Sequence, residues 1–125
     1  MRRVLIGAAV ALALLVEGAA VAQGVSTVQY AQPFRAQTLA GTVLAGLMGT
    51  PVKDVLVEEC TPGWKVVESQ TKTDDAGHFS LPGPARTQLY YLRLSANGFN
   101  TTLIKVRVSS KAHDKKLSLK IEVST

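Results

Sequence analysis

The chain has 125 residues, of which 46% are hydrophobic and 18% charged, with a formal net charge of +5. Its single cysteine excludes an intrachain disulfide scaffold, and one cysteine with two histidines argues against a structural zinc site of the usual Cys/His type. The mild positive excess favours contact with acidic surfaces and says nothing about fold.

The first 22 residues have the three parts of a secretory signal. Arg2 and Arg3 form a basic start, and residues 4–16 are an apolar run too short for a comfortable membrane span. The small residues Ala20 and Ala22 stand at the two positions that a signal peptidase reads. We therefore expect cleavage after Ala22 and a secreted or periplasmic protein that does not span a membrane once the signal is removed. The alternative is an uncleaved membrane anchor.

The rest of the chain divides into an arm and one domain. Residues 23–37 are polar without a sustained period, so we expect a flexible N-terminal arm, whereas residues 38–125 suffice for one core. Apolar and polar residues then alternate in short runs bounded by turn residues, which is typical of strands. The predicted runs lie at 39–43, 55–58, 67–73, 79–81, 90–95, 103–108 and 117–123.

Seven short strands, each with one apolar and one polar face, predict an all-β fold: a seven-stranded antiparallel β-sandwich whose two sheets bury their apolar faces against each other. No segment after the signal has apolar residues at helical spacing over three turns. The inward positions of the runs predict the core, which is expected to include Val43, Val55, Val57, Phe79, Leu92, Leu94, Ile104, Val106, Leu119 and Ile121.

Four pieces of sequence occur in a recognisable order. They are Leu39–Val43, Gly49–Glu58, Thr73–Phe79 and Tyr91–Phe99, the third with the pattern T-D-x-x-G-x-F. Together they resemble the carboxypeptidase regulatory-like domain family over about residues 39–108. The resemblance implies a prealbumin-like (transthyretin-like, Ig-like) Greek-key sandwich.

The same resemblance implies an accessory or adhesion-type module without catalytic residues, cofactor or metal. The catalytic zinc of the carboxypeptidases belongs to a neighbouring domain. Hydroxyisourate hydrolases, which share the wider fold, end in Tyr-Arg-Gly-Ser, whereas this chain ends in residues 121–125 with the sequence IEVST. That activity therefore does not carry over, and we expect no enzyme.

The stretch from Lys72 to Leu81, KTDDAGHFSL, holds two carboxylates and a histidine and is the main candidate for chemistry. In the family this pattern is a hairpin, in which Asp74 caps its own turn and Gly77 supplies a positive φ. Phe79 is then expected to point into the core. The stretch is predicted to be a structural turn.

Two chemical alternatives exist for the same stretch. A calcium ligand pair at Asp74 and Asp75 would need several more oxygen ligands from elsewhere in the chain. His78 and Ser80 have the types of a nucleophilic pair, but they lie two residues apart on one predicted strand, and no motif presents a nucleophile.

Four residues are candidates for binding a partner: Trp64, Arg93, Lys105 and Arg107. A loop tryptophan offers a large surface for a sugar ring or a protein partner, or else it folds over a sandwich edge. If runs 90–95 and 103–108 form a hairpin, the three cations share one outward face. That face is either simply solvated or contacts an acidic glycan, lipid head groups or an acidic protein. Nucleic acid is disfavoured because no stacking aromatics interleave with the cations.

The favoured hypothesis is an exported, non-catalytic binding module whose partner is a protein or glycan of the cell envelope. The alternative is a structural protein that forms homo-oligomers through its sandwich edges, and a small hydrolase on the same fold is a third. Cys60 is either a buried thiol or the site of an intermolecular bridge.

Overall fold

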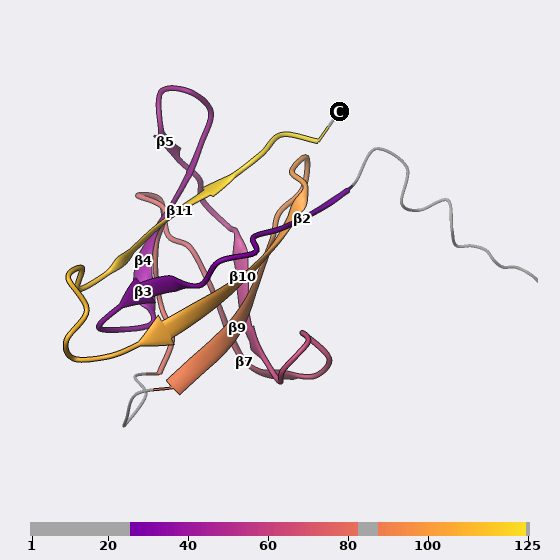
Figure 1. Ribbon diagram of the computed structural model, residues 1–125. Helices are drawn as coiled ribbons and strands as arrows, with labels where there is room; N and C mark the ends of the chain where they lie inside the picture. Colours follow the sequence, from indigo (N-terminus) through magenta and orange to yellow (C-terminus); the bar gives the residue numbers. More distant parts are fainter. Residues whose placement is uncertain (1–25, 83–87, 125) are drawn as a thin grey trace, which may run out of the picture.

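The computed structural model describes residues 26–82 and 88–124, and these residues form strands and turns without a helix (Figure 1). The expected signal at 1–22 lies outside the described residues, as do 23–25, 83–87 and 125. The strands are β2 (Thr27–Gln29), β3 (Phe34–Ala36), β4 (Ala40–Ala45), β5 (Thr50–Pro51), β6 (Leu56–Cys60), β7 (Val67–Lys72), β8 (His78–Ser80), β9 (Gln88–Ser95), β10 (Thr101–Val108) and β11 (Leu117–Ile121).

These strands form two sheets around one core. The larger sheet has the order β2-β10-β9-β6-β7, with β3 also beside β10, and the smaller sheet has the order β11-β4-β5, with β8 also beside β4. Strands of both sheets contribute to a single cluster of buried apolar side chains. The arrangement is an all-β, two-sheet fold, as the alternation predicts.

The alternation also predicts which side chains face the core. Along β10 every second residue is buried, and β11 alternates in the same way between buried and exposed. All ten predicted core residues are at most 5% exposed, so the predicted core is confirmed. Burial of this many apolar side chains is the main favourable contribution to folding.

The sheets are mixed, which corrects the expectation of a purely antiparallel sandwich. The pairs β9–β10, β6–β9 and β6–β7 are antiparallel. However, β2 and β3 run parallel to β10, and β11 runs parallel to β4. Short loops join the antiparallel neighbours β6–β7 and β9–β10, whereas strands far apart in the sequence are free to pair in either direction.

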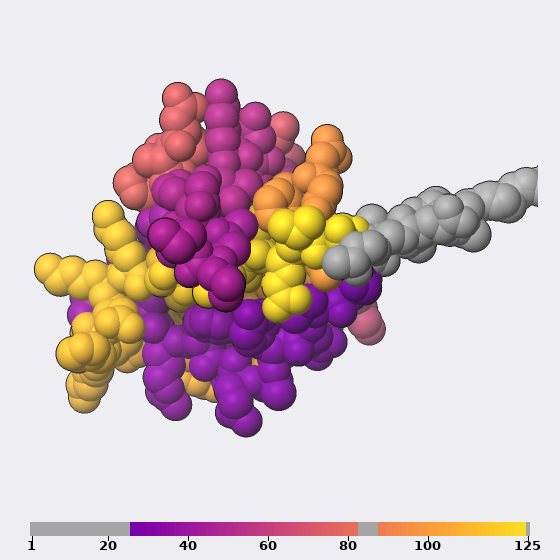
Figure 2. All heavy atoms as spheres, turned by 90° about the horizontal axis from the view of Figure 1, so that it is seen from above, coloured from indigo at the N-terminus to yellow at the C-terminus, as the bar shows by residue number. Residues whose placement is uncertain are grey.

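The segment expected to be a flexible arm contributes two strands where it is described. Phe34 packs against the core, and Ala36 is fully buried beneath the sheet. The amide of Tyr30 donates to the carbonyl of Leu103 at 3.0 Å, and the Tyr30 ring packs edge-on against Phe34. Figure 2 shows this indigo segment along one side of the molecule, next to the golden loop that follows β10. Residues 26–37 are therefore part of the domain.

Candidate functional site

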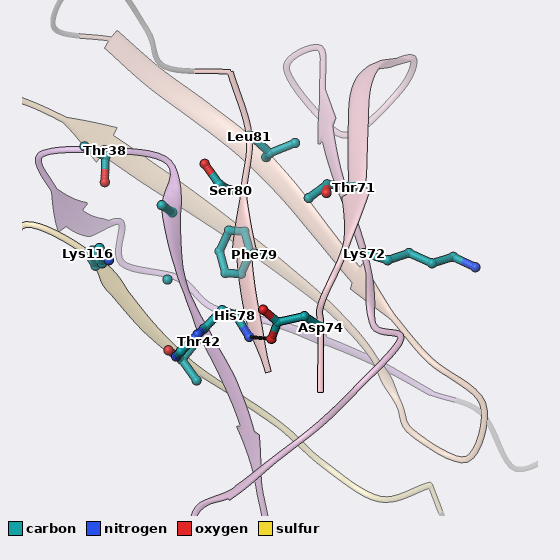
Figure 3. A pocket seen from close by; sticks show the side chains of 12 residues that line it. Thr38, Thr42, Thr71, Lys72, Asp74, His78, Phe79, Ser80, Leu81 and Lys116 are labelled. Atoms are coloured by element: carbon teal, nitrogen blue, oxygen red, sulfur yellow. Dashed lines mark hydrogen bonds between the residues drawn. The ribbon is translucent and has the colours of Figure 1, made fainter. Parts of the chain in front are cut away.

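The stretch with two carboxylates is a tight turn that links β7 of the larger sheet to β8 of the smaller sheet. The expected hairpin is not formed, because the two strands pair with β6 and β4 instead of with each other. Asp74 Oδ1 accepts a hydrogen bond from the amide of His78 at 2.9 Å (Figure 3). It also accepts one from the amide of Ala76 at 2.9 Å. Gly77 has a φ of +77°, and its amide donates to the carbonyl of Asp74 at 2.9 Å. The backbone hydrogen bond from His78 first, and then that from Ala76, lower the pKa of the Asp74 carboxyl. The predicted cap and the predicted glycine conformation are both confirmed.

The other polar groups of this turn are also accounted for. Asp75 forms an exposed ion pair with Lys53 at 3.2 Å. His78 is exposed and pairs across the sheet with Thr42 of β4. Across residues 26–82 and 88–124, no group of three or more His, Cys, Asp and Glu side chains could hold a metal ion. The carboxylates of this turn are thus engaged in structure.

Thr73, just before the turn, has a structural role that the sequence did not reveal. Its side chain is 3% exposed. Thr73 Oγ1 accepts from the amide of Val55 at 2.9 Å and donates to the carbonyl of Val52 at 2.6 Å. It therefore satisfies two backbone groups in front of β6, where an unpaired group would be costly. Thr73 is the first residue of the T-D-x-x-G-x-F pattern, and this position was the one sign in the sequence of its structural role.

The three cations singled out from the sequence do share one face of the larger sheet. Arg93, Lys105 and Arg107 alternate with residues that point into the core, such as Leu92 and Val106, which are fully buried. Across the β9–β10 hairpin, Lys105 pairs with Tyr91, and Arg93 pairs with Leu103. We call this side the outer face, defined by Glu58, Trp64, Tyr91, Arg93, Lys105 and Arg107.

Arg93 is the cation of the outer face that is already neutralised. Its Nε donates to Glu58 Oε1 at 2.8 Å, and its Nη1 donates to the carbonyl of Trp64 at 3.5 Å. The bond to Glu58 raises the pKa of Arg93. Because its charge is paired with Glu58, Arg93 supports the structure of the outer face and is not available to bind an acidic ligand.

Trp64 folds back onto the sheet, as one of the two interpretations expected. Its Nε1 donates to the carbonyl of Leu92 at 3.0 Å, and its ring packs edge-on against Tyr91 with centroids 5.0 Å apart. The side chain is half-buried. Trp64 and Tyr91 together form an aromatic pair in the middle of the outer face, with Lys105 opposite Tyr91 on the next strand.

Lys105 and Arg107 are the available charges of the outer face. In the described part of the chain, the ion pairs are Lys53–Asp75 and Arg93–Glu58, and neither involves these two residues. Both side chains are half-buried along β10. A cation held on a sheet without a counter-charge is open to an acidic ligand.

Cys60 ends β6 opposite Tyr91 and is a free, buried thiol. Burial raises its pKa, which outweighs the opposing effect of the nearby Arg93 charge. Cys60 also lies outside the cluster that forms the core. The sequence left a buried thiol and an intermolecular bridge open, and this environment favours the buried thiol.

Arg35 is a charged residue beside the outer face that the sequence did not single out. It lies on β3, in the segment expected to be an arm, and pairs with Arg107 of β10. Its side chain is exposed. The local pattern gave no signal, because a strand of three residues shows too few alternations to be recognised.

Among the described residues, no helix is long and apolar enough to cross a membrane.

Comparison with known proteins adds little to this geometry. No family model and no curated protein matches the chain. Among solved structures, 3-chlorocatechol 1,2-dioxygenase from Rhodococcus opacus 1CP is similar over 78% of this chain, with 14% identity and a TM-score of 0.39. The chain spans 64% of the length of that structure. A likeness this weak transfers neither fold nor activity.

Proposed function

We propose that the protein is an exported, non-catalytic binding module on a carboxypeptidase regulatory-like, prealbumin-like sandwich, and that its outer face binds an acidic partner in the cell envelope. The observation that carries this proposal is the pair of unneutralised cations, Lys105 and Arg107, beside the aromatic pair of Trp64 and Tyr91. The cations lie on β10, Tyr91 lies on the adjacent β9, and Trp64 packs against Tyr91 from the loop between β6 and β7.

An acidic glycan suits this combination of groups. Aromatic rings offer a large apolar surface at low entropic cost, which suits the face of a sugar ring. Lys105 is directly opposite Tyr91, so a carboxylate or ester group on the same sugar chain would meet a cation one strand away. An acidic protein surface is the other partner that these charges would attract.

The state of the remaining polar groups supports a role without catalysis. Asp74, the first carboxylate of the KTDDAGHFSL stretch, accepts two backbone hydrogen bonds and caps a turn. His78 and Ser80 are exposed side chains on a three-residue strand. None of these groups is held in the mutual geometry of a nucleophile and its base.

Binding to acidic polysaccharides tests the proposal. The protein is titrated by calorimetry with polygalacturonate and dextran sulfate, with neutral dextran as the ligand control. We expect binding that weakens with salt and that is lost in the Lys105→Gln/Arg107→Gln double variant. A matched pair, Lys116→Gln/Lys120→Gln, removes the same charge from around β11 and should bind normally. Equal losses in both double variants would show attraction by net charge alone.

A second candidate function is assembly through sheet edges, and the topology favours it. Within residues 26–82 and 88–124, β7 pairs only with β6 and β8 pairs only with β4, so each strand has an edge that no described strand covers. A hollow of about 690 Å³ is lined by residues of β4, β7 and β8, with Thr71 and Lys72 on one side of β8 and Thr42 and Lys116 on the other (Figure 3). Unpaired edges accept a strand from another chain.

One substitution separates assembly from ligand binding. The amide of Leu81 donates to the carbonyl of Leu39, so the amide of Ser80, one residue earlier, faces away from β4. Ser80→Pro removes that amide and should abolish any oligomer seen by light scattering. Polysaccharide binding should persist in the same variant. A monomer at all concentrations would eliminate the assembly function.

A further inference from the structure

A small hollow lies where β3, the end of β10 and the following loop meet. Its volume is about 200 Å³, and its lining is Arg35, Arg107, Ser109, Lys111, Ala112 and His113. Three of these side chains are cations, and a fourth is an imidazole. We propose that this hollow is a binding site for a phosphate or sulfate group. The inference rests on the proposed function and refines it, because it names the chemical group that the acidic ligand carries.

Two arginines of the lining occupy paired positions on adjacent strands. The parallel register of β3 and β10 pairs Arg35 with Arg107. The neighbours Ala36 and Val108 are buried, so both arginines point to the outer side of the sheet. Like charges on paired positions destabilise a sheet. An anion between them removes this repulsion, and guanidinium groups bind oxyanions with two parallel hydrogen bonds each.

The loop that completes the hollow is held in place by hydrogen bonds to β3 and the residue after it. The amide of Ser109 donates to the carbonyl of Ala36 at 3.0 Å. Gln37 Nε2 donates to the carbonyl of Ala112 at 3.0 Å, and the amide of Gln37 donates to the carbonyl of Asp114 at 3.0 Å. Lys111 and His113 are therefore carried on an anchored backbone, which lowers the entropic cost of binding.

The hollow contains hydrogen-bond donors without a protein counter-charge. The two ion pairs of the described residues, Lys53–Asp75 and Arg93–Glu58, lie outside it. Ser109 Oγ accepts from the amide of Lys111 at 3.2 Å, which leaves the hydroxyl proton for another acceptor. Three cations and a hydroxyl match the charge and acceptor number of a phosphate group better than those of a single carboxylate.

The position of the hollow fits a ligand that extends along the outer face. Arg107 lines the hollow and also belongs to the outer face, followed by Lys105 opposite Tyr91. A sugar chain with a phosphate or sulfate ester could place the ester in the hollow and its rings against the aromatic pair. The same ester chemistry occurs in lipid head groups, so the source of the group must be tested as well.

Titration with inorganic phosphate and sulfate tests the site directly. The full chain is titrated by calorimetry and by amide NMR, and we expect saturable binding with shifts centred on Arg35 and Lys111. Arg35→Gln should weaken binding by roughly tenfold or more. Arg35→Lys, which keeps the charge but loses the paired hydrogen bonds, should lie in between. Lys120→Gln, an exposed lysine on β11 of the other sheet, should bind as the parent does.

Thermal unfolding gives a second, independent readout. Phosphate should raise the melting temperature of the parent protein by mass action. Arg35→Gln should raise it without any phosphate, because it removes the repulsion from Arg107, and should cancel the rise caused by phosphate. Lack of saturable phosphate or sulfate binding, or binding that Arg35→Gln leaves unchanged, would overturn the site.

Two further arms identify the source of the group and separate this site from the proposed function. Glucose 6-phosphate represents a sugar ester, and vesicles containing phosphatidylglycerol represent a lipid. Arg35-dependent binding of either one supports the site and assigns its source. Dextran sulfate binding that needs Lys105 but not Arg35, without Arg35-dependent phosphate binding, would refute the site and leave the proposed function standing. Phosphate binding without polysaccharide binding would refute the proposed function and leave the site.

Discussion

Arg93 and Glu58 occupy directly paired positions on β9 and β6, and Arg93 Nε donates to Glu58 Oε1 at 2.8 Å. Their side chains are only 30% and 12% exposed, so water screens the pair incompletely. The pair holds the part of the outer face that carries Trp64, whose carbonyl accepts a second hydrogen bond from Arg93.

We expect Arg93→Gln or Glu58→Gln to lower the free energy of unfolding by roughly 1–2 kcal/mol, as for a hydrogen bond between charged groups. The double variant should lose less than the sum of the two, which urea unfolding would measure. Glu58→Gln should also strengthen binding to acidic polysaccharide, because it frees a third cation. Strictly additive losses would mean that the two charges do not interact.

Gly77 and Gly46 separate backbone strain from steric clash. Both have a φ of +77°. A Cβ at Gly77 would lie 2.8 Å from the carbonyl oxygen of Val43, whereas a Cβ at Gly46 would meet nothing within 4 Å. Gly46→Ala should therefore cost only the left-handed backbone, about 1–2 kcal/mol. Gly77→Ala should cost clearly more in urea unfolding, and equal losses would contradict the close approach to β4.

Phe79 tests the core. Its side chain is 5% exposed between the sheets. Phe79→Ala removes a buried ring and leaves a cavity, so the free energy of unfolding should fall by roughly 3–5 kcal/mol. Val66→Ala, at a position that is 61% exposed, should change it by less than about 0.5 kcal/mol. Similar values for the two variants would show that Phe79 is not packed as described.

The lowered pKa of Asp74 leads us to expect that the free energy of unfolding falls in acid. Backbone hydrogen bonds, that from His78 first, lower its pKa below the ordinary value of 3.8. Because the folded pKa is the lower one, the stabilising contribution is complete above 3.8 and is lost as the pH falls through the folded pKa. Asp74→Asn should therefore be less stable than the parent at neutral pH, and the two should converge in acid. Urea midpoints across this range measure the difference, and a constant difference would rule out this linkage.

Cys60 is expected to be chemically inert in the folded protein. Burial raises its pKa, so little thiolate is present near neutral pH. Alkylation by iodoacetamide should be much slower in the native protein than in urea, where the thiol is exposed. Rapid modification without denaturant would indicate that the end of β6 opens readily.

The sequence predicts the parts of this fold that depend on local alternation. Val57 and Leu94, or Ile104 and Val106, lie on runs long enough to define an inward side, and short loops join β6 to β7 and β9 to β10 as hairpins. β3 is different, because only Phe34 and Ala36 of its three residues face inward. The parallel direction of β3 and β11 depends on pairing between distant segments, which no local pattern encodes.

The candidate site likewise has features that local alternation predicts and features that depend on pairing between distant strands. The shared face of Arg93, Lys105 and Arg107 follows from one hairpin and was predictable. The neutralisation of Arg93 depends on the register between β6 and β9, and the position of Arg35 depends on β3. Both depend on how distant strands pair. As a result Arg93 forms an ion pair with Glu58, whereas Arg35 and Arg107 occupy paired positions without a counter-charge.

The long-range pairing of the chain ends has a consequence for folding kinetics. Thr38 Oγ1 donates to the carbonyl of Lys115, which is 77 residues further along the sequence. The strands on either side of Thr38, β3 and β4, take their parallel partners from β10 and β11. High contact order slows folding, because chain entropy is lost before the distant contacts form. During synthesis the early strands cannot pair until the last ones are made, so the protein should be most vulnerable to proteases just before its C-terminal strands emerge.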